Sequence, residues 1–479
     1  MRMDYPIYDP PRPQHPRRRR RSKMQIFKEA YLPTIILAVT IVLIIVFIIG
    51  AAVRQDDPNG PQPSGSDANG STPPGTTQQT KPSDSAALRL EAQICLEEAE
   101  QLAAAYDYDG AIAVLEGFSG EIAEFPPLQE AYQRYTSIKE RMVAWKAEDV
   151  YNLSVDMLIA DPVRAFADSK YGSTYKKDML TTTEFAAILQ QLYDNGYVLV
   201  RLQDFYGKEF NSTTGRYVFR ERELLLPAGK KPILLTQTNA NYYTYMTDSN
   251  GDGMPDAGGD GFASRLCFDG RRFYNELIHA DGAVSTGSYD VVPLLEDFIA
   301  DHPDFSYKGA RAIVAFSGYD GVLGYRIQST KLEAAALQQE RAGAAAIVEA
   351  LKNAGYDLAF GTFDNINYTT ATATQVRTDI QNWLDQVTPW IGSLDILVFP
   401  QGGDIAGTED YTGNSKYNLL YNAGIRFFLG TADAPWNQVD NQYVRHSCLR
   451  ITGQNLQSKP ELYTGLFDPA AVKDSARGA

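Results

Sequence analysis

The oxygen-bearing side chains of residues 248–256 have the clearest chemical spacing in this sequence. Positions 1, 3, 5 and 9 of a calcium-loop pattern are filled by Asp248, Asn250, Asp252 and Asp256, and position 6 is glycine. Position 12 is Gly259, not the bidentate glutamate of an EF-hand. The pattern therefore predicts either a weak calcium site with these four ligands or a plain Gly/Asp turn.

Imidazole ligands for a transition metal are scarce. The whole chain has four histidines, at positions 15, 279, 302 and 446, and no two of them stand three or four residues apart. A zinc hydrolase typically needs three protein ligands and an open position for water, so zinc chemistry is not expected. Nucleophile-elbow, Walker and dinucleotide motifs are also absent from the sequence. A glycosidase-type pair of carboxylates remains open, because sequence alone gives no separation.

From residue 150 onward, apolar strand-like runs alternate with helical segments. Strands are expected at residues 197–202, 232–237, 312–316, 357–360, 396–399 and 426–429. Such alternation predicts an α/β fold in which a parallel sheet is covered by helices. Six or more units in about 300 residues fit a closed or nearly closed β/α barrel, whose chemistry sits where the strands end.

Three runs carry a resemblance to a known family. They are residues 179–205 (MLTTTEFAAILQQLYDNGYVLVRLQDF), 226–246 (LPAGKKPILLTQTNANYYTYM) and 289–326, which ends in FSGYDGVLGYR. In order and spacing they resemble the bacterial polysaccharide deacetylases, the NodB-homology domains, over about residues 150–430. The resemblance implies a distorted (β/α) barrel of the polysaccharide-deacetylase type over residues 148–457.

The sequence departs from that family where its chemistry resides. The family's paired aspartates, a base and a metal ligand, match Thr238 and Asn239, and its two metal-binding histidines match Gly361 and Asn365. An early strand-end histidine matches Asp156, and Asp404 stands at a later strand end. Neutral side chains cannot act as a general base near pH 7, so a metal-free, catalytically inactive barrel is expected.

The resemblance implies a carbohydrate ligand, which for an inactive relative means binding or scaffolding of a cell-wall glycan. Aromatic and hydrogen-bonding groups suit sugar rings, and the candidate contacts are Tyr242, Tyr243, Phe363 and Tyr368. Two alternatives stay open. One is an active carbohydrate deacetylase or hydrolase with a non-standard site; the other is a protein-interaction module acting through the helical segment described next.

Residues 86–147 show helical periodicity with a turn at Tyr106–Gly110. The stretch LAAAYDYDGAIAVLE resembles one tetratricopeptide-type hairpin, too few repeats for a solenoid. Either a helical spacer or a peptide-binding module fits. Residues 458–479 are expected to be a C-terminal tail.

The N-terminal part predicts a membrane anchor. A basic tail (residues 1–30) precedes an uncharged apolar run (31–53), and a Pro/Gly/Ser/Thr-rich linker (54–85) follows it. The run is long enough to span a bilayer, and the preceding arginines place the N-terminus in the cytoplasm. A single-pass cell-membrane protein with an extracellular C-terminal domain is expected; a cleaved signal peptide is the alternative. The net charge of −15 argues against nucleic acid as a partner.

Overall fold

The computed structural model describes residues 82–168 and 170–478. Residues 80–479 form one compact unit. The expected basic tail (1–30), apolar run (31–53) and nearly all of the expected linker (54–85) lie outside the described residues. At the end of that linker, residues 82–85 already belong to a helix.

The predicted membrane location requires a correction. Within residues 82–168 and 170–478, no helix combines the length and the apolar character needed to cross a bilayer. The expectation of a single-pass protein with a cytoplasmic N-terminus and an extracellular domain rested on residues 31–53 and is withdrawn.

Three helices open the described chain: α3 (Pro82–Ala104), α4 (Tyr108–Glu116) and α5 (Pro126–Lys139). The predicted turn joins α3 to α4, and the Asp107 carboxylate caps α4 by accepting the N–H of Gly110. This helical block is joined to the barrel, because the N–H of Lys308 donates to the carbonyl of Ala105 at 2.8 Å. The Tyr106 hydroxyl donates to the carbonyl of Asp304 at 2.7 Å.

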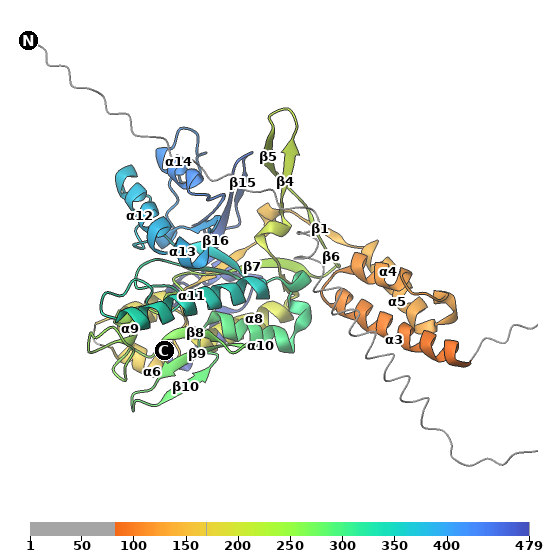
Figure 1. Cartoon of the computed structure of the whole chain (residues 1–479), viewed down its shortest axis with the longest axis horizontal. Coiled ribbons are helices and arrows are strands. Elements are labelled where there is room, and N and C mark those ends of the chain that lie inside the picture. The colour runs from red at the N-terminus through yellow and green to blue at the C-terminus, as the bar shows by residue number, and fades with distance from the viewer. Residues whose placement is uncertain (1–81, 169, 479) are drawn as a thin grey trace, which may run out of the picture. The chain divides into compact units, whose positions relative to one another are not determined.

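Seven parallel strands close into a barrel, as the β/α alternation predicts. They are β2 (Asn152–Val155), β7 (Lys231–Gln237), β11 (Ile313–Phe316), β12 (Asp357–Phe360), β13 (Ile396–Val398), β14 (Phe427–Thr431) and β16 (Val444–Arg450). They follow one another around the ring in chain order, and β16 pairs with β2 to close it. The fold is therefore a (β/α) barrel (Figure 1).

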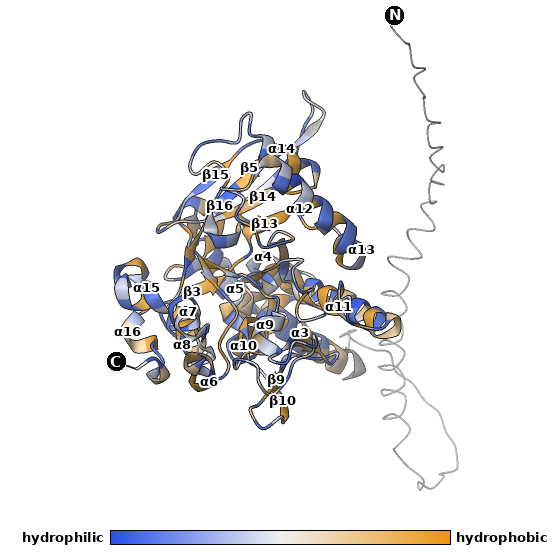
Figure 2. Ribbon diagram, turned by 90° about the vertical axis from the view of Figure 1, so that its left-hand side faces the viewer, coloured by the Kyte–Doolittle hydropathy of each residue, from blue (hydrophilic) through white to orange (hydrophobic). Residues whose placement is uncertain are grey.

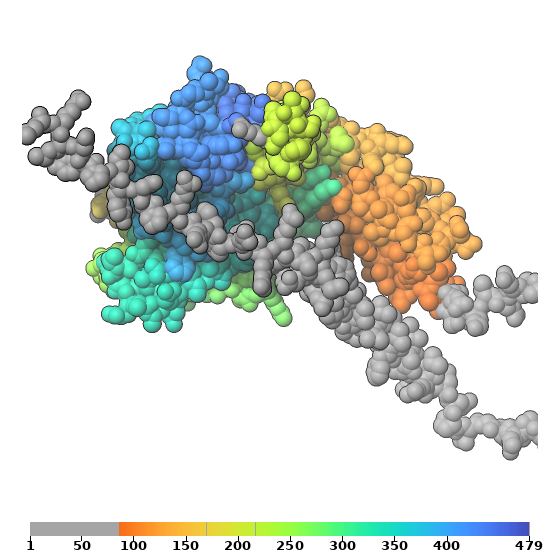
Figure 3. All heavy atoms as spheres, turned by 45° about the horizontal axis from the view of Figure 1, so that its top comes forward, coloured from red at the N-terminus to blue at the C-terminus, as the bar shows by residue number. Residues whose placement is uncertain are grey.

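Several features distort the barrel. The first half of β7 pairs with an extra strand, β3 (Tyr197–Leu199), and only its second half pairs with β11. Between β14 and β16 the chain runs through a short antiparallel strand, β15 (Asn437–Val439), in place of a helix. Three further small sheets lie outside the ring: β1 (Val143–Trp145) with β6 (Leu224–Leu226), β4 (Tyr206–Asn211) with β5 (Arg216–Glu221), and β8 (Arg265–Phe268) with β9 (Phe273–Ile278) and β10 (Val284–Gly287). The β4–β5 hairpin stands out as a separate lobe in the space-filling view (Figure 3).

Helices cover the outside of the barrel, and α8, α10 and α11 lie along one side of it (Figure 1). The longer ones are α8 (Thr182–Asp194), α10 (Val291–Asp301), α11 (Ala334–Ala354), α12 (Ala373–Gln386) and α14 (Ser415–Asn422). Shorter ones are α6 (Pro162–Ala167), α7 (Gly172–Asp178), α9 (Thr244–Thr247), α13 (Thr388–Ile391), α15 (Gly453–Ser458) and α16 (Pro469–Val472). Thr181 and Glu184 form a reciprocal capping box at the start of α8.

Alternation along the strands divides the apolar residues into two layers. Leu153, Val314 and Phe428 belong to the core between strands and covering helices, whereas Ile313, Ala315 and Leu429 belong to a second core inside the barrel. Figure 2 shows hydrophobic residues concentrated on strands such as β13 and β14 and a largely hydrophilic α12. The interior of the barrel is thus filled by side chains.

Residues 458–479, expected to be a tail, fold onto the barrel domain within the described range. The Arg477 side chain is 1% exposed, and its guanidinium pairs with the carboxylate of Glu184, which is fully buried. The backbone N–H of Asp474 donates to the same carboxylate at 3.1 Å. This long-range ion pair fixes the segment against α8.

Candidate site at the carboxyl ends of the barrel strands

A cavity of about 90 Å³ opens where the barrel strands end. Four of the six positions singled out by sequence line it: Thr238 and Asn239 after β7, and Gly361 and Asn365 after β12. Arg450, the last residue of β16, also lines it and was not anticipated. We call this cavity the barrel mouth.

Asp156 follows β2 and places one carboxylate beside the barrel mouth. Its Oδ2 accepts a hydrogen bond from Nδ2 of Asn239 at 3.0 Å and lies 3.6 Å from the guanidinium of Arg450. Its Oδ1 accepts the N–H of Met157 at 2.9 Å. Burial raises the pKa of Asp156, while Arg450 and the amide of Asn239 act in the opposite direction. This carboxylate is held by fixed partners.

The backbone is strained around the barrel mouth. Asn239, Thr362, Asn365 and Gln401 all have φ between 53° and 63°, a region that L residues seldom adopt. Asparagine tolerates it, but β-branched Thr362 does so at a cost. Strained residues of this kind persist where the surrounding structure holds them, and they gather at functional sites.

Asp404 lies beside the barrel mouth but does not line the cavity. Its carboxylate is 3.1 Å from the guanidinium of Arg445, which is fully buried, and accepts the hydroxyl of Tyr411 at 2.7 Å. Both partners come from the outer layer of the barrel. Asp404 therefore acts as the counter-ion of a buried arginine.

The predicted aromatic contacts occupy different environments. Tyr242 and Tyr368 are 1% and 0% exposed, and their hydroxyls bond to the buried Asn275 and Asp379. They are core residues that a ligand cannot reach, and we leave them out of the site. Tyr243 adjoins the barrel mouth, with its hydroxyl 3.4 Å from Oδ1 of Asn239.

Two tyrosines that sequence reasoning missed extend an aromatic surface from Tyr243. Tyr245 stacks on Tyr243 with 5.6 Å between ring centroids and an 18° interplanar angle, and Tyr319 lies 6.0 Å from Tyr243. Tyr245 is 44% exposed and Tyr319 51%. The signal for Tyr245 was its position two residues after Tyr243, and Tyr319 stands three residues after the end of β11 in a Gly-Tyr-Asp-Gly turn.

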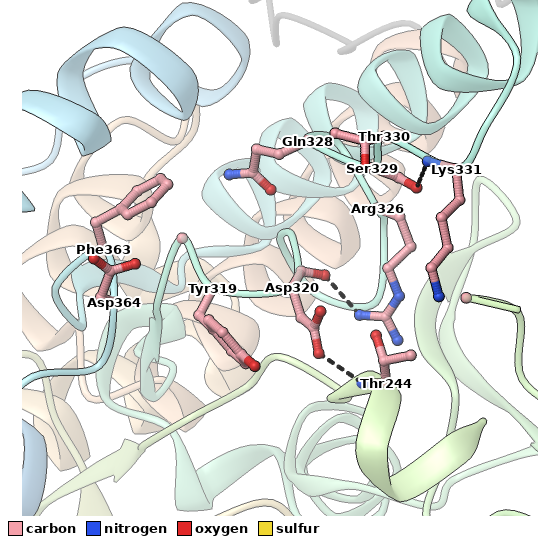
Figure 4. Close-up of a pocket in the computed structure, with 12 residues that line it drawn as sticks. Thr244, Tyr319, Asp320, Arg326, Gln328, Ser329, Thr330, Lys331, Phe363 and Asp364 are labelled. Carbon is pink, nitrogen blue, oxygen red and sulfur yellow. Dashed lines mark hydrogen bonds between the residues drawn. The ribbon is translucent and has the colours of Figure 1, made fainter. Parts of the chain in front are cut away.

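A larger cavity of about 300 Å³ adjoins this aromatic surface (Figure 4). Its lining residues include Tyr319, Phe363, Asp320, Asp364, Arg326 and Lys331. Polar groups also come from Thr244, Gln328, Ser329 and Thr330. We call it the arginine pocket. Phe363, a predicted glycan contact, is half-buried on its wall.

Asn241, which is fully buried, fixes the loop that shapes the arginine pocket. Its Nδ2 donates to the carbonyls of Ser317, Tyr319 and Gly321 at 3.0–3.2 Å, and its Oδ1 accepts the N–H of Ser317 at 2.9 Å. The side chain thus adds to the few backbone hydrogen bonds of this loop, such as that from the N–H of Gly318 to the carbonyl of Thr362 at 3.2 Å. These hydrogen bonds from Asn241 position Tyr319.

The calcium-loop pattern forms a tight turn whose carboxylates bond to its own backbone. The Asp248 carboxylate accepts the N–H groups of Gly251 and Gly253, each at 2.6 Å. The Asp256 carboxylate accepts the N–H groups of Ser249 and Asn250, each at 3.1 Å. These oxygens would have to turn from N–H groups to an ion for calcium to bind, and calcium binding stays a prediction.

The donor set at the barrel mouth does not fit a zinc-type ion. Thr238 and Asn239 offer a hydroxyl and an amide, Gly361 offers no side chain, and the one carboxylate, of Asp156, is already bonded. Over residues 82–168 and 170–478, no group of three or more His, Cys, Asp and Glu side chains converges on one point. We derive no reaction step through a metal.

Comparisons with known proteins give little more. No protein-family model matches the chain, and no curated protein matches it. Among solved structures, the Streptococcus pyogenes deacetylase PplD in complex with acetate superimposes on 68% of this chain and 100% of its own length. Its identity is 10% and its TM-score 0.33, and we draw no conclusion from so loose a superposition.

Proposed function

We propose that this chain binds a carbohydrate at the carboxyl end of its barrel and does not deacetylate it by the metal-dependent route of the polysaccharide deacetylases. The observation that carries this proposal is the exposed aromatic surface of Tyr245 and Tyr319, which both pack on the buried Tyr243 beside the Asp156–Asn239 pair. Exposed aromatic side chains that gather beside polar groups in this way are typical of binding surfaces.

The chemistry of such a surface suits sugar rings. The apolar faces of a pyranose can pack on tyrosine rings, while its hydroxyls need hydrogen-bond partners at the ring edge. Amide and guanidinium groups for that purpose are supplied by Asn365, Gln401 and Arg450 at the barrel mouth. Backbone strain at Asn365 and Gln401 fits residues held in place for contact with a ligand.

The residues at the barrel mouth support binding rather than turnover. Metal-dependent deacetylation needs a bound water of lowered pKa, a carboxylate base and stabilisation of the oxyanion. Thr238, Asn239, Gly361 and Asn365 supply neither a base nor imidazoles, and the carboxylate of Asp156 is held by Asn239 and Arg450.

Binding is tested by calorimetric titration of the full-length protein with chito-oligosaccharides and xylo-oligosaccharides. Tyr245→Ala and Tyr319→Ala should each weaken binding about tenfold or more, since a buried aromatic contact contributes about 1.5–3 kcal/mol. Tyr217→Ala on the β4–β5 hairpin, where the side chain is 69% exposed, is the matched control. Equal losses in all three variants, or no binding by the wild-type protein, would reject the proposal.

Turnover is tested on acetylated chito-oligosaccharides and acetylated xylan with zinc, cobalt or manganese supplied. We expect acetate release at background, because every family ligand and the base are replaced. Acetate release abolished by a chelator would show that another set of side chains holds a metal.

One observation favours a second candidate, an active carbohydrate hydrolase. A carboxyl group whose pKa is raised by burial, at the edge of a cavity, is a candidate general acid, and Asp156 is such a group. Under this candidate, Asp156→Asn would abolish release of reducing ends while leaving oligosaccharide binding intact. Under the leading proposal, the wild-type protein itself releases no reducing ends.

A further inference from the structure

Three arginines are buried in the part of the chain that the structure describes, and two of them have an obvious counter-ion. Arg445 lies 3.1 Å from a carboxylate oxygen of Asp404, and Arg477 is paired with Glu184. The guanidinium of Arg326, a residue that is 6% exposed, has no carboxylate oxygen within 4.0 Å among residues 82–168 and 170–478. Burying a charge is costly unless it is paired, so Arg326 lacks what the other two have.

The bonds that Arg326 does make go to neutral acceptors. Its Nη1 donates to the carbonyl of Asp320 at 2.7 Å and its Nη2 to the carbonyl of Tyr242 at 2.5 Å, while Nε has no partner. These bonds fix the guanidinium in place, but they do not neutralise its charge.

The nearest acids are engaged elsewhere. A carboxylate oxygen of Asp320 accepts the N–H of Thr244 at 2.9 Å. The carboxylate of Glu340 accepts the backbone N–H of Arg326 at 2.6 Å and lies 3.3 Å from the side chain of Arg265. The carboxylates of Asp320 and Glu340 therefore act on the charge of the Arg326 guanidinium by electrostatic attraction alone, without direct contact.

The arginine pocket lies against this unpaired guanidinium (Figure 4). A second cation, Lys331, lies on the same wall and donates to the carbonyl of Gly251. Hydroxyl groups of Ser329, Thr330 and Thr244 are also available on the lining. A fixed guanidinium, an ammonium and hydroxyl donors around a cavity of about 300 Å³ are the components of an oxyanion site.

We propose that the arginine pocket is a subsite for an anionic group of the ligand, a carboxylate or a phosphate. The anion supplies the counter-charge that Arg326 lacks. Asp320 and Asp364 also line the pocket, Asp320 beside Arg326 and Asp364 at the far end next to Phe363 (Figure 4). The identity of the ligand rests on the proposed function: we expect an acidic oligosaccharide whose neutral rings contact Tyr319 and Tyr245. The presence of an anion-binding subsite does not rest on it.

The test compares two forms of one ligand. Full-length protein is titrated with an oligosaccharide of neutral sugars that carries one hexuronic acid, and with the same oligosaccharide after its carboxylate is reduced to an alcohol. The acidic form should bind at least about tenfold more tightly at low salt, as expected for hydrogen bonds to charged groups. The advantage should shrink at high salt, because exposed charge pairs are screened. Competition by sodium acetate or by inorganic phosphate distinguishes a carboxylate site from a phosphate site.

Variants assign the preference to the pocket. Lys331→Met, at an exposed position, should lower the advantage of the acidic form several-fold without disturbing the fold, and Arg326→Met should abolish it. Lys177→Met is the matched control, because that lysine is exposed and does not line the pocket. Equal affinity for both forms of the ligand, or a preference that survives both pocket variants, would overturn the inference.

Failure of the proposed function is recognised separately. If neither form of the oligosaccharide binds, carbohydrate binding is rejected, and phosphate and acetate are then tested alone by thermal melting. A rise of the wild-type midpoint that is lost in Lys331→Met would still support an oxyanion pocket, and no rise would overturn it.

Discussion

The amide nitrogen of Asn239 lies 3.0 Å from a carboxylate oxygen of Asp156, so the residues that follow two neighbouring barrel strands hold each other. Arg450, which ends the strand on the other side of β2, completes the group at 3.6 Å. The floor of the barrel mouth is thus a closed set of polar contacts in which the acid has an amide and a cation as partners.

Asp156→Asn should make the protein more stable at pH 7. Burial raises the pKa of Asp156 above its ordinary 3.8 in the folded state. Between 3.8 and that raised value, the folded state holds the proton more tightly than the unfolded state, so stability falls as the pH rises. Above that window, the ionised carboxylate costs stability that asparagine avoids.

The measurement for Asp156 is urea unfolding of both proteins from pH 7 down to pH 4. The advantage of the variant should shrink as the pH falls, because protonation of the wild-type carboxyl removes the buried charge. A variant that is less stable than wild type at pH 7 would mean that the contact with Arg450 outweighs desolvation.

Arg477→Met should destabilise the protein by about 3–5 kcal/mol, because it leaves the buried Glu184 carboxylate without its cation. Replacing both residues, as Arg477→Met with Glu184→Gln, should recover much of that loss. Denaturant unfolding of the wild type, both single variants and the double variant gives the coupling energy. Additive single losses would contradict a direct ion pair.

The barrel was predictable from sequence because its strands are apolar and regularly separated by helices, as at Asp357–Phe360 before α12. The last strand, β16, was missed. It reads VRHSCLR, and its inward residues Val444, His446 and Cys448 do not form an apolar run. His446, which reads from sequence as a surface residue, is 1% exposed inside the barrel. Because β16 was not predicted, its last residue, Arg450, was not predicted as a site residue.

Long-range contacts were the other part that sequence could not supply. No local pattern predicts that Arg477 reaches Glu184, so residues 458–479 looked like a tail. The same limit applied to the tyrosines. Tyr242 and Tyr243 are adjacent in sequence and both are buried, yet the hydroxyl of Tyr242 contacts Asn275 and that of Tyr243 contacts Asn239 at the barrel mouth.

Asn241→Asp should unfold or loosen the loop that carries Tyr319. The two side chains have nearly the same shape, but a carboxylate cannot donate to the carbonyls of Ser317, Tyr319 and Gly321. Three unsatisfied acceptors should cost at least about 3 kcal/mol. Urea unfolding checks the loss, and hydrogen exchange at residues 317–321 should accelerate. An unchanged exchange rate would show that the loop does not depend on Asn241.

Calcium should stabilise the turn at residues 248–256 weakly, with a dissociation constant on the order of 10⁻³ M. At ~5 mM calcium this corresponds to about 1 kcal/mol of added stability. Thermal melts with calcium and with chelator make the comparison, and Asp248→Asn serves as the control that should not respond. Identical wild-type midpoints with calcium and with chelator would show that the turn does not bind calcium and is held by its own backbone contacts.

The pairing that closes the ring has a consequence for how the protein is made. Strand β2 begins at Asn152, and the strand that closes onto it ends at Arg450, 298 residues later (450 − 152). At ~5–20 residues per second, translation of that interval takes about 15–60 s. For that time, the free edge of β2 is a nascent-chain surface that other strands could pair with. The barrel can therefore close only late in synthesis, after its last strand has been made.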